Sequence, residues 1–306
     1  MKLDLVIVTY NRLEKLKKAL QCYERQTKTF RNLIVVNNHS NDGTKDFLEE
    51  WELINSPFSK HVINTDENLG GSGGFYIGQK YAMTLNPDWI YLADDDAYAE
   101  PDMIETFYGF CETNEIDKVS AICGTVRNLN GEIALQHRCT FELINKSIYK
   151  RINSVNEDYQ KESFQIDLLS YVCAFINVKA LKKCGLVNPK YFIYFDDTEH
   201  SIRLKKYGII ICVSNIKIIH EEIPNKDGCD ELWKKYYIIR NHCHMLRKHF
   251  FRAAIDRTIY MLKQSKNVKY CDNMNRKIIR TAIFDAWCGR LGRHKTYKPG
   301  WIPQRG

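Results

Sequence analysis

The 306-residue sequence contains no apolar run that approaches the roughly 20 residues needed to span a bilayer as a helix. Its first residues, Met1 to Val8, lack the layout of a secretory signal peptide, and Leu3 to Val8 are predicted to form a core strand. The 11 cysteines are odd in number and include no Cys-x-x-Cys pair, which argues against a disulfide framework and a zinc ribbon. Internal repeats and low-complexity segments are also missing. We therefore expect a cytoplasmic protein with reduced thiols.

The overall net charge of +8 conceals two regions of opposite sign. Residues 231–306 contain 18 Lys and Arg against 4 Asp and Glu, a net charge of +14, whereas residues 1–230 contain 27 against 33, a net charge of −6. We expect a main domain over 1–230 and a basic, mainly helical region over 231–306. The asymmetry suggests an anionic partner, such as a membrane surface, a lipid phosphate or nucleic acid, or else a merely solvated basic appendage.

The first half of the chain alternates apolar runs with amphipathic segments, which predicts βαβ units and a mainly parallel sheet flanked by helices. Ligands of such sheets bind at the carboxyl ends of the strands. The expected strands are residues 3–8, 33–36, 61–64 and 89–93, and the expected helices are 11–26, 44–51, a helix through Tyr76 and Tyr81, and 101–110. In the second half we expect strands at 119–125, 168–176, 209–213 and 216–219, a helix at 198–207 and a basic amphipathic helix at 247–263.

Three successive carboxylates, Asp94, Asp95 and Asp96, follow the apolar run 89–93. Such residues repel one another and disfavour strands, so stability alone would not select them. Hard oxygen ligands at a strand end suit a divalent cation that holds a diphosphate. A solvated turn is the alternative.

Polar turns follow the first two predicted strands. Thr9, Asn11 and Arg12 end the first, and Asn37 and Asn38 end the second. Their amide and hydroxyl groups could hydrogen-bond a nucleobase edge and a ribose, although each turn alone is weak support because such residues are common in caps and turns.

Four glycines within five positions, Gly70, Gly71, Gly73 and Gly74, predict a turn where the backbone approaches a ligand and presents N–H groups to an anion. A Rossmann fingerprint is excluded, because that motif follows the first strand and this one follows the third. A purely structural turn remains the alternative.

A second group of acids, Asp196, Asp197 and Glu199, follows the aromatic segment 191–195 at a predicted helix start. Helix-dipole stabilisation is the structural interpretation, while an aromatic wall that raises a carboxylate pKa would produce a general base. His220 ends the run 216–219, where it is either structural or the third ligand of a carboxylate metal site.

Taken in order over roughly residues 3–241, these motifs resemble the inverting family 2 glycosyltransferases with the GT-A fold. The resemblance rests on Val-Thr-Tyr-Asn-Arg, Asn-Asn-x-Ser-x-Asp-Gly-Thr, Asn-Leu-Gly-Gly-x-Gly-Gly, Asp-Asp-Asp, Asp-Asp-x-Glu and the later His. The glycine-rich and Phe-Asp-Asp-Thr-Glu-His segments look most like bacterial galactofuranosyltransferases, with rhamnosyltransferases as near relatives.

The resemblance implies a role for each matching residue. Asp94, Asp96 and His220 would hold Mn²⁺ or Mg²⁺ against a UDP-sugar diphosphate, and Asp197 would be the catalytic base. The remaining site residues fall into two groups. Asp196 and Glu199 would orient the acceptor or the base, and the donor pocket would include Thr9, Asn11, Arg12, Asn38, Gly71 and Asp95.

One departure from the family pattern concerns the second-strand turn, where an acid that accepts from the uracil N–H is usual and this chain has Asn37-Asn38. An amide can still accept that bond, so UDP remains the expected nucleotide. The expected function is transfer of galactofuranose to a lipid-linked or polysaccharide acceptor in cell-surface glycan synthesis, peripherally at the inner membrane face. No nucleic-acid partner is expected, and an oligomer is possible.

This function has three rivals. The first is a rhamnosyltransferase that uses dTDP-rhamnose, and the second is an inactive GT-A binding or assembly module. The third is a nucleotidyltransferase, which should carry a glycine-rich loop with a basic residue directly after the first strand, and here that position holds Thr9-Tyr10-Asn11-Arg12.

Overall fold

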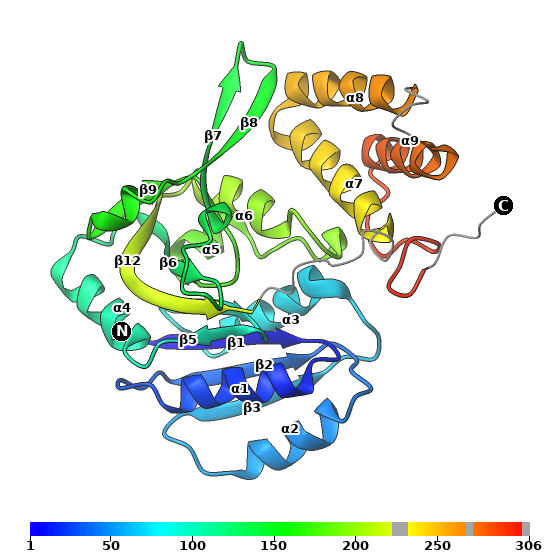
Figure 1. The fold of residues 1–306 in the computed structure, drawn as a ribbon. Coiled ribbons are helices and arrows are strands. Elements are labelled where there is room, and N and C mark those ends of the chain that lie inside the picture. The colour runs from blue at the N-terminus through cyan, green and yellow to red at the C-terminus, as the bar shows by residue number, and fades with distance from the viewer. Residues whose placement is uncertain (222–231, 267–271, 302–306) are drawn as a thin grey trace.

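The computed structural model describes residues 1–221, 232–266 and 272–301. Its first part alternates strands and helices, which confirms the sequence prediction (Figure 1). These elements are β1 (Leu3–Thr9), α1 (Leu13–Glu24), β2 (Asn32–Asn37), α2 (Thr44–Leu53), β3 (Ser59–Asn64), α3 (Gly70–Thr84), β4 (Trp89–Asp94), β5 (Ala97–Ala99), α4 (Met103–Thr113) and β6 (Val119–Arg127). Strands β3, β2, β1 and β4 are neighbours in that order and all parallel, so their carboxyl ends share one edge of the sheet.

The second part extends this sheet with mixed pairings. Its elements are η1 (Leu135–His137), β7 (Arg138–Ile144), β8 (Ile148–Asn153), η2 (Asp158–Gln160), β9 (Ser163–Ile166), β10 (Leu168–Leu169), β11 (Ala174–Asn177), α5 (Val178–Cys184), η3 (Pro189–Tyr191), α6 (Asp196–Leu204) and β12 (Ile209–His220). Strand β11 lies antiparallel between β4 and β6, and β12 runs parallel to β6 and antiparallel to β5 and β9. Strands β10, β7 and β8 form a separate small sheet.

Helices cover both faces of the main sheet because alternate strand residues point to opposite sides. Leu3, Leu5 and Ile7 of β1 belong to the core shared with α1, α2 and α4, whereas Val6 and Val8 belong to the core shared with α3, α5 and α6. All five side chains are buried, and burying each such side chain stabilises the fold by about 1.5–3 kcal/mol. The architecture is a three-layer α/β fold.

The glycine-rich segment is helical rather than a turn, which corrects the sequence prediction. Gly70 opens α3, and the later glycines lie inside the helix. A Cβ on Gly74 would stand 2.4 Å from Val8 Cγ1, and one on Gly78 would stand 2.2 Å from Val6 Cγ1. These two glycines therefore allow α3 to lie close against β1.

Three further predictions in the second half were wrong in detail. The single strand expected at 168–176 is two short strands, β10 and β11, which belong to different sheets. The two strands expected at 209–213 and 216–219 form one strand, β12, whose register shifts between Val213 and Lys217. The helix expected at 247–263 is divided at Phe250 between two helices.

The C-terminal helices are α7 (Leu232–His249), α8 (Phe251–Lys266) and α9 (Asn273–Cys288). They pack against one another beside the β7–β8 hairpin, and α7 also shares a hydrophobic core with Phe192, just before α6 (Figure 1). The expected domain boundary at residue 230 lies outside the described residues. Among the helices that the structure describes, none combines the length and apolarity needed to cross a membrane.

Candidate active site

A cleft of about 950 Å³ opens at the carboxyl ends of β1 and β4. One wall comes from the ends of these strands and the start of α3, and the other comes from residues 192–198 and the start of α7. Most of the residues predicted from the sequence line it: Thr9, Arg12, Asn38, Gly71, Asp94, Asp95, Asp96, Asp196, Asp197 and His220. Asn11 and Glu199 are not among its lining residues.

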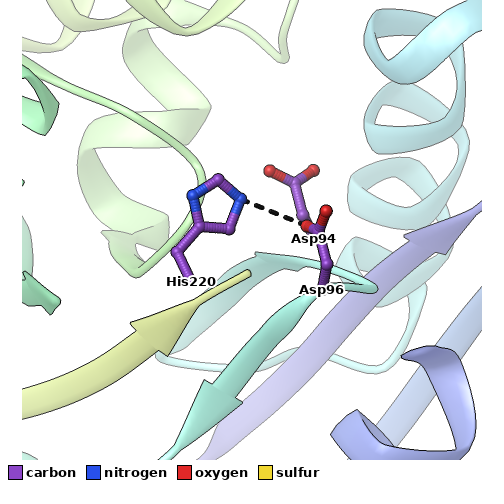
Figure 2. Close-up of side chains that lie close together, drawn as sticks. All are labelled: Asp94, Asp96 and His220. Atoms are coloured by element: carbon purple, nitrogen blue, oxygen red, sulfur yellow. Dashed lines mark hydrogen bonds and ion pairs between the residues drawn. The ribbon is translucent and has the colours of Figure 1, made fainter. Parts of the chain in front are cut away.

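Asp94, Asp96 and His220 converge in this cleft, with one possible ligand atom of each lying within 4.8 Å of the others (Figure 2). The sheet causes this convergence, since β4 ends at Asp94 and β5 pairs Ala97 with His220 at the end of β12. His220 Nε2 lies 3.2 Å from Asp96 Oδ1. Two carboxylates and an imidazole are a donor set that suits Mn²⁺ or Mg²⁺, so the residues present fit a divalent cation.

Positive side chains surround these carboxylates. Arg12 Nη1 donates to Asp96 Oδ2 over 2.7 Å, and Lys15 Nζ lies 3.5 Å from the same oxygen. Burial alone would raise the pKa of Asp96, but the hydrogen bond from His220 and the charge of Arg12 hold it below its ordinary value. Burial and the neighbouring Asp96 raise the pKa of Asp94 to about 7. Of the two carboxyl groups, Asp96 is therefore the more firmly ionised.

Asp95, the third carboxylate, is hydrogen-bonded to residues at the end of β1. It accepts from Thr9 Oγ1 over 2.7 Å and from Arg12 Nη1 over 3.1 Å, and it is buried. Thr9 and Arg12 thus lie in the cleft wall with their polar groups turned toward Asp95.

The amides at the end of β2 are already occupied by protein partners. Asn38 Nδ2 donates to the Gly70 carbonyl over 3.0 Å, and Asn38 Oδ1 accepts from Leu69 N over 2.9 Å. Asn37 Nδ2 donates to Asn64 Oδ1 over 2.8 Å. These asparagines hold the start of α3 and the sheet edge, so the free amide expected for base recognition is not what the structure presents.

Asn11 also differs from its expected position in the donor pocket. It adopts a left-handed backbone with φ of 53°, and its Oδ1 accepts from Asn41 N over 2.8 Å. Because its side chain ties the β1 turn to the β2 turn, it shapes the rim of the cleft from outside.

The two glycines that open α3 have different surroundings. Gly70 has φ of +72°, and a Cβ there would stand 2.0 Å from the Phe192 carbonyl oxygen. A Cβ on Gly71 would meet no described atom within 4 Å, and Gly71 lines the cleft. Gly70 is therefore required by the fold, whereas Gly71 leaves room for a ligand.

Asp196 and Asp197 open α6 on the opposite wall. Burial raises the pKa of both carboxyl groups, and for Asp196 the neighbouring Asp197 raises it further. Asp197 Oδ1 accepts from the backbone N and the hydroxyl of Thr198, which partly offsets its desolvation. A desolvated carboxylate in a cleft has the properties of a proton acceptor.

Residues 4–185 match the family model described as Glycosyl transferase family 2. The chain belongs to this family. The matched range ends before Asp196, Asp197 and His220, so part of this family 2 site lies beyond it.

Two curated relatives and a solved structure show what this chain resembles. It is 29% identical over 210 residues to the galactofuranosyltransferase GlfT1 of Mycobacterium tuberculosis strain H37Rv, a match that covers 67% of this chain and only 64% of that relative. It is 23% identical over 264 residues to the dTDP-rhamnosyl transferase RfbF of Shigella flexneri, covering 79% of each chain. The crystal structure of GalNAc-T7 with UDP, GalNAc and Mn²⁺ has a TM-score of 0.64 at 12% identity, covering 95% of this chain and 56% of that one.

Glu199 is not among the residues that line the cleft in this family 2 protein. Its buried carboxylate accepts from Arg203 Nε, Lys248 Nζ and His249 Nε2, each over 2.9 Å. Burial alone would raise its pKa, but these donors hold the pKa well below its ordinary value. Glu199 therefore joins α6 to α7, which differs from the expected contact with the acceptor.

Two buried residues of α7 hold the backbone of the segment that leads to Asp197. Asn241 Nδ2 lies 2.8–2.9 Å from the carbonyl oxygens of Tyr191, Ile193 and Tyr194. Arg240 Nη2 donates to the Tyr191 carbonyl over 3.0 Å. Because Phe192, Tyr194 and Phe195 all have positive φ, this strained segment needs such external support. We call Arg240 and Asn241 the α7 brace.

Sequence reasoning missed several residues of this cleft. Arg151 and Trp233 line the cleft, and the charge of Arg151 acts on Asp197. Neither carries a local signal, since Arg151 sits in a polar strand and Trp233 in an amphipathic helix. Lys15 could have been found, because it lies one helical turn after Arg12.

Proposed function

We propose that this chain is a metal-dependent inverting glycosyltransferase that transfers galactofuranose from UDP-galactofuranose to a hydroxyl group of its acceptor. The observation that carries the proposal is one cleft with two kinds of acid. Asp94 and Asp96 converge there with His220, and the desolvated Asp197 lies on the facing wall.

Asp94, Asp96 and His220 would hold Mn²⁺ or Mg²⁺. The bound ion would supply Lewis-acid stabilisation of the negative charge on the leaving diphosphate. The GalNAc-T7 structure contains UDP and Mn²⁺ in the same fold, which supports this choice of cofactor. Arg12 and Lys15 add positive charge beside Asp96.

Asp197 would take the proton from the acceptor hydroxyl. The acceptor oxygen then forms its bond to the anomeric carbon as the bond from that carbon to the diphosphate oxygen breaks. The electron pair leaves with UDP, and the proton stays on the Asp197 carboxyl group. One displacement inverts the anomeric configuration and needs one base, and the raised pKa of Asp197 makes it a stronger base.

The choice of donor rests on the relatives. The galactofuranosyltransferases match at 29% identity and the dTDP-rhamnosyl transferase at 23%, so galactofuranose is preferred and rhamnose is the second candidate. An inactive binding or assembly module would be expected to lose the acids or the metal-site histidine, and all of them are present.

The acceptor is proposed to be a lipid-linked saccharide or a polysaccharide in cell-surface glycan synthesis. The +14 charge of residues 231–306 supports peripheral association with an anionic membrane face, where a lipid-diphosphate-linked acceptor would be found.

The first experiment is release of the nucleoside diphosphate by the purified protein with Mn²⁺, offered a panel of UDP-sugars, including both the furanose and the pyranose form of UDP-galactose, and then dTDP-rhamnose. We expect turnover with the furanose alone. Turnover with dTDP-rhamnose instead would select the second donor. Failure with every nucleotide sugar would favour the inactive module.

A further inference from the structure

Helix α8 has an exposed apolar stripe along its length. Phe251, Ile255, Ile259 and Leu262 recur at intervals of three or four residues, which places them on one face. Their exposed fractions are 58%, 39%, 47% and 37%. Ala253, Ala254 and Met261, which lie outside this stripe, are buried in the protein. We call the four exposed residues the α8 stripe, which extends for about 16 Å along the helix.

Basic residues flank the α8 stripe. Helix α8 contains Arg252, Arg257, Lys263 and Lys266 against a single acid, Asp256. Arg252, Lys263 and Lys266 are exposed. An apolar stripe beside basic side chains is the pattern of a helix that lies in the interface of an anionic bilayer.

A second exposed apolar group lies at the tip of the β7–β8 hairpin. Leu143, Ile144 and Ile148 are 38%, 39% and 52% exposed, and Lys146 stands at the turn between the strands. The hairpin tip projects at the same end of the molecule as α8 (Figure 1).

The hairpin is joined firmly to the start of α8. The ring of Phe250 packs on Phe141 and Tyr149, with centroids 5.3 and 5.7 Å apart. Phe251, the first residue of the α8 stripe, follows directly, so both apolar groups belong to one rigid part of the protein.

We infer that the α8 stripe and the hairpin tip are the surface that docks on an anionic lipid bilayer. The inference deepens the proposed function by naming its membrane-facing elements, and it rests on that function only for the identity of the acceptor. The apolar side chains enter the headgroup boundary, and the basic flank binds lipid phosphates.

This docking would bring lipid-linked acceptors close to the base. Ile148 and Arg151 are three residues apart on β8, which corresponds to about 10 Å along an extended strand. Arg151 lines the cleft and acts electrostatically on Asp197. A saccharide linked to a lipid headgroup therefore has a short path from the bilayer to Asp197.

The test is sedimentation of the full chain with large vesicles, made either of phosphatidylcholine alone or of phosphatidylcholine mixed with phosphatidylglycerol. We expect binding to the anionic vesicles that weakens with salt, because the Debye length falls from about 10 Å at 0.1 M to about 3 Å at 1 M. The double variant Ile255→Glu, Ile259→Glu should lower the partition coefficient at least about tenfold, since two apolar contacts are replaced by negative charges.

A matched control is Leu53→Glu, Ile54→Glu, which changes two exposed apolar residues at the end of α2, 85% and 62% exposed. It should bind vesicles like the wild type. Ile144→Glu, Ile148→Glu tests the hairpin tip separately and should weaken binding as well. Circular dichroism of each variant shows that it has folded.

Three results would overturn the inference: no binding by the wild type, equal binding to neutral vesicles, or an α8 variant that binds like the control. If instead the α8 variant converts a dimer to a monomer in light scattering while vesicle binding persists, the stripe contacts a second copy of the chain. Vesicle binding needs no turnover, so its failure is distinct from failure of the transferase assay.

Discussion

Asp96 and Asp197, two carboxylates of the same cleft, have opposite surroundings. Asp96 is bound by Arg12 and His220, with Lys15 nearby, whereas within the described residues Asp197 accepts from the neutral backbone N and hydroxyl of Thr198. The pKa of Asp96 is consequently lowered and that of Asp197 is raised. The same type of side chain is thereby prepared for two tasks, since a charge-compensated acid stays ionised, as a metal ligand must, and a desolvated acid binds a proton more readily.

The largest effect should come from the desolvated group. Asp197→Asn removes the proposed base and should lower kcat about 10³-fold while UDP binding is retained. Asp196→Asn is the matched comparison, because burial already raises the pKa of that carboxyl well above its ordinary value and a neutral amide resembles its protonated form. We expect a loss of at most about tenfold there. Near-normal turnover by Asp197→Asn would remove the distinction between the groups.

Glu199 extends the comparison between Asp96 and Asp197, because its negative charge is compensated by three donors at a buried position outside the cleft. Glu199→Gln should lower the free energy of unfolding by about 3 kcal/mol at pH 7, because three donors lose their charged partner. The folded pKa lies below the ordinary value of 4.5, so this stabilisation is present above that pH and is lost as the pH falls. Urea unfolding at pH 7 and pH 3 should show the difference between variant and wild type shrinking in acid.

Glu14→Gln is the control for that experiment, since Glu14 pairs with Lys17 over 2.8 Å at a highly exposed position. It should change the unfolding free energy by less than about 0.5 kcal/mol. An equal effect of the two substitutions would show that burial of the Glu199 cluster contributes nothing.

The metal side of the comparison predicts an effect on cation affinity. Asp96→Asn should weaken Mn²⁺ binding about 100-fold, because one of two charged ligands becomes neutral. Electron paramagnetic resonance of free Mn²⁺ measures this without turnover. Asp95→Asn should keep affinity within about tenfold, since Asp95 is turned toward Thr9 and Arg12. The reverse order would reassign the ligands.

The α7 brace should affect turnover more than folding. Asn241→Ala frees three carbonyls of the segment before Asp197, and a shift of that segment should lower kcat about 30-fold. Asn177→Ala removes another buried asparagine, which donates to the Val119 carbonyl and caps α5 far from the cleft. If both variants lose stability alike and keep the same kcat, the brace has no positioning role.

The smallest effect concerns the donor side. Gly71→Ala adds a methyl group where the cleft is open, so it should raise the KM for the donor about tenfold with unchanged melting temperature. Gly70→Ala should instead lower the melting temperature, because its Cβ would collide with the Phe192 carbonyl. A normal donor KM in Gly71→Ala would place the donor elsewhere.

The sequence predicts those parts of the structure that depend on residues close together in the chain. The alternating strands and the acidic site residues at 94–96 could be predicted, because an apolar run followed by carboxylates can be recognised within ten residues of sequence. His220 was a candidate because it ends a strand, but its pairing with Asp96 depends on β5 folding back onto β12. Such a contact spans 124 positions and has no local signature.

The failures have the same physical origin. Asn38 looked available for a nucleobase, yet tertiary packing gives both of its amide atoms protein partners. Glu199 looked like a site acid because the neighbouring Asp196 and Asp197 are site acids. Its position on α6, however, points its carboxylate toward α7 rather than into the cleft. The glycines of α3 suggested a turn because glycine is common in turns. Their close approach to β1 depends on tertiary packing, which the local sequence does not show.

The α7 brace donates hydrogen bonds to backbone carbonyl oxygens of the segment before Asp197 and not to the side chains of that segment. Ile193 and Tyr194 line the cleft, yet Asn241 holds only their backbone. Replacements at these two positions would therefore keep the hydrogen bonds of Asn241, although both side chains also pack on the hydrophobic core of α7. Evolution could change the proposed acceptor by replacing Ile193 and Tyr194, which line the cleft, while the proposed base Asp197 stays in place.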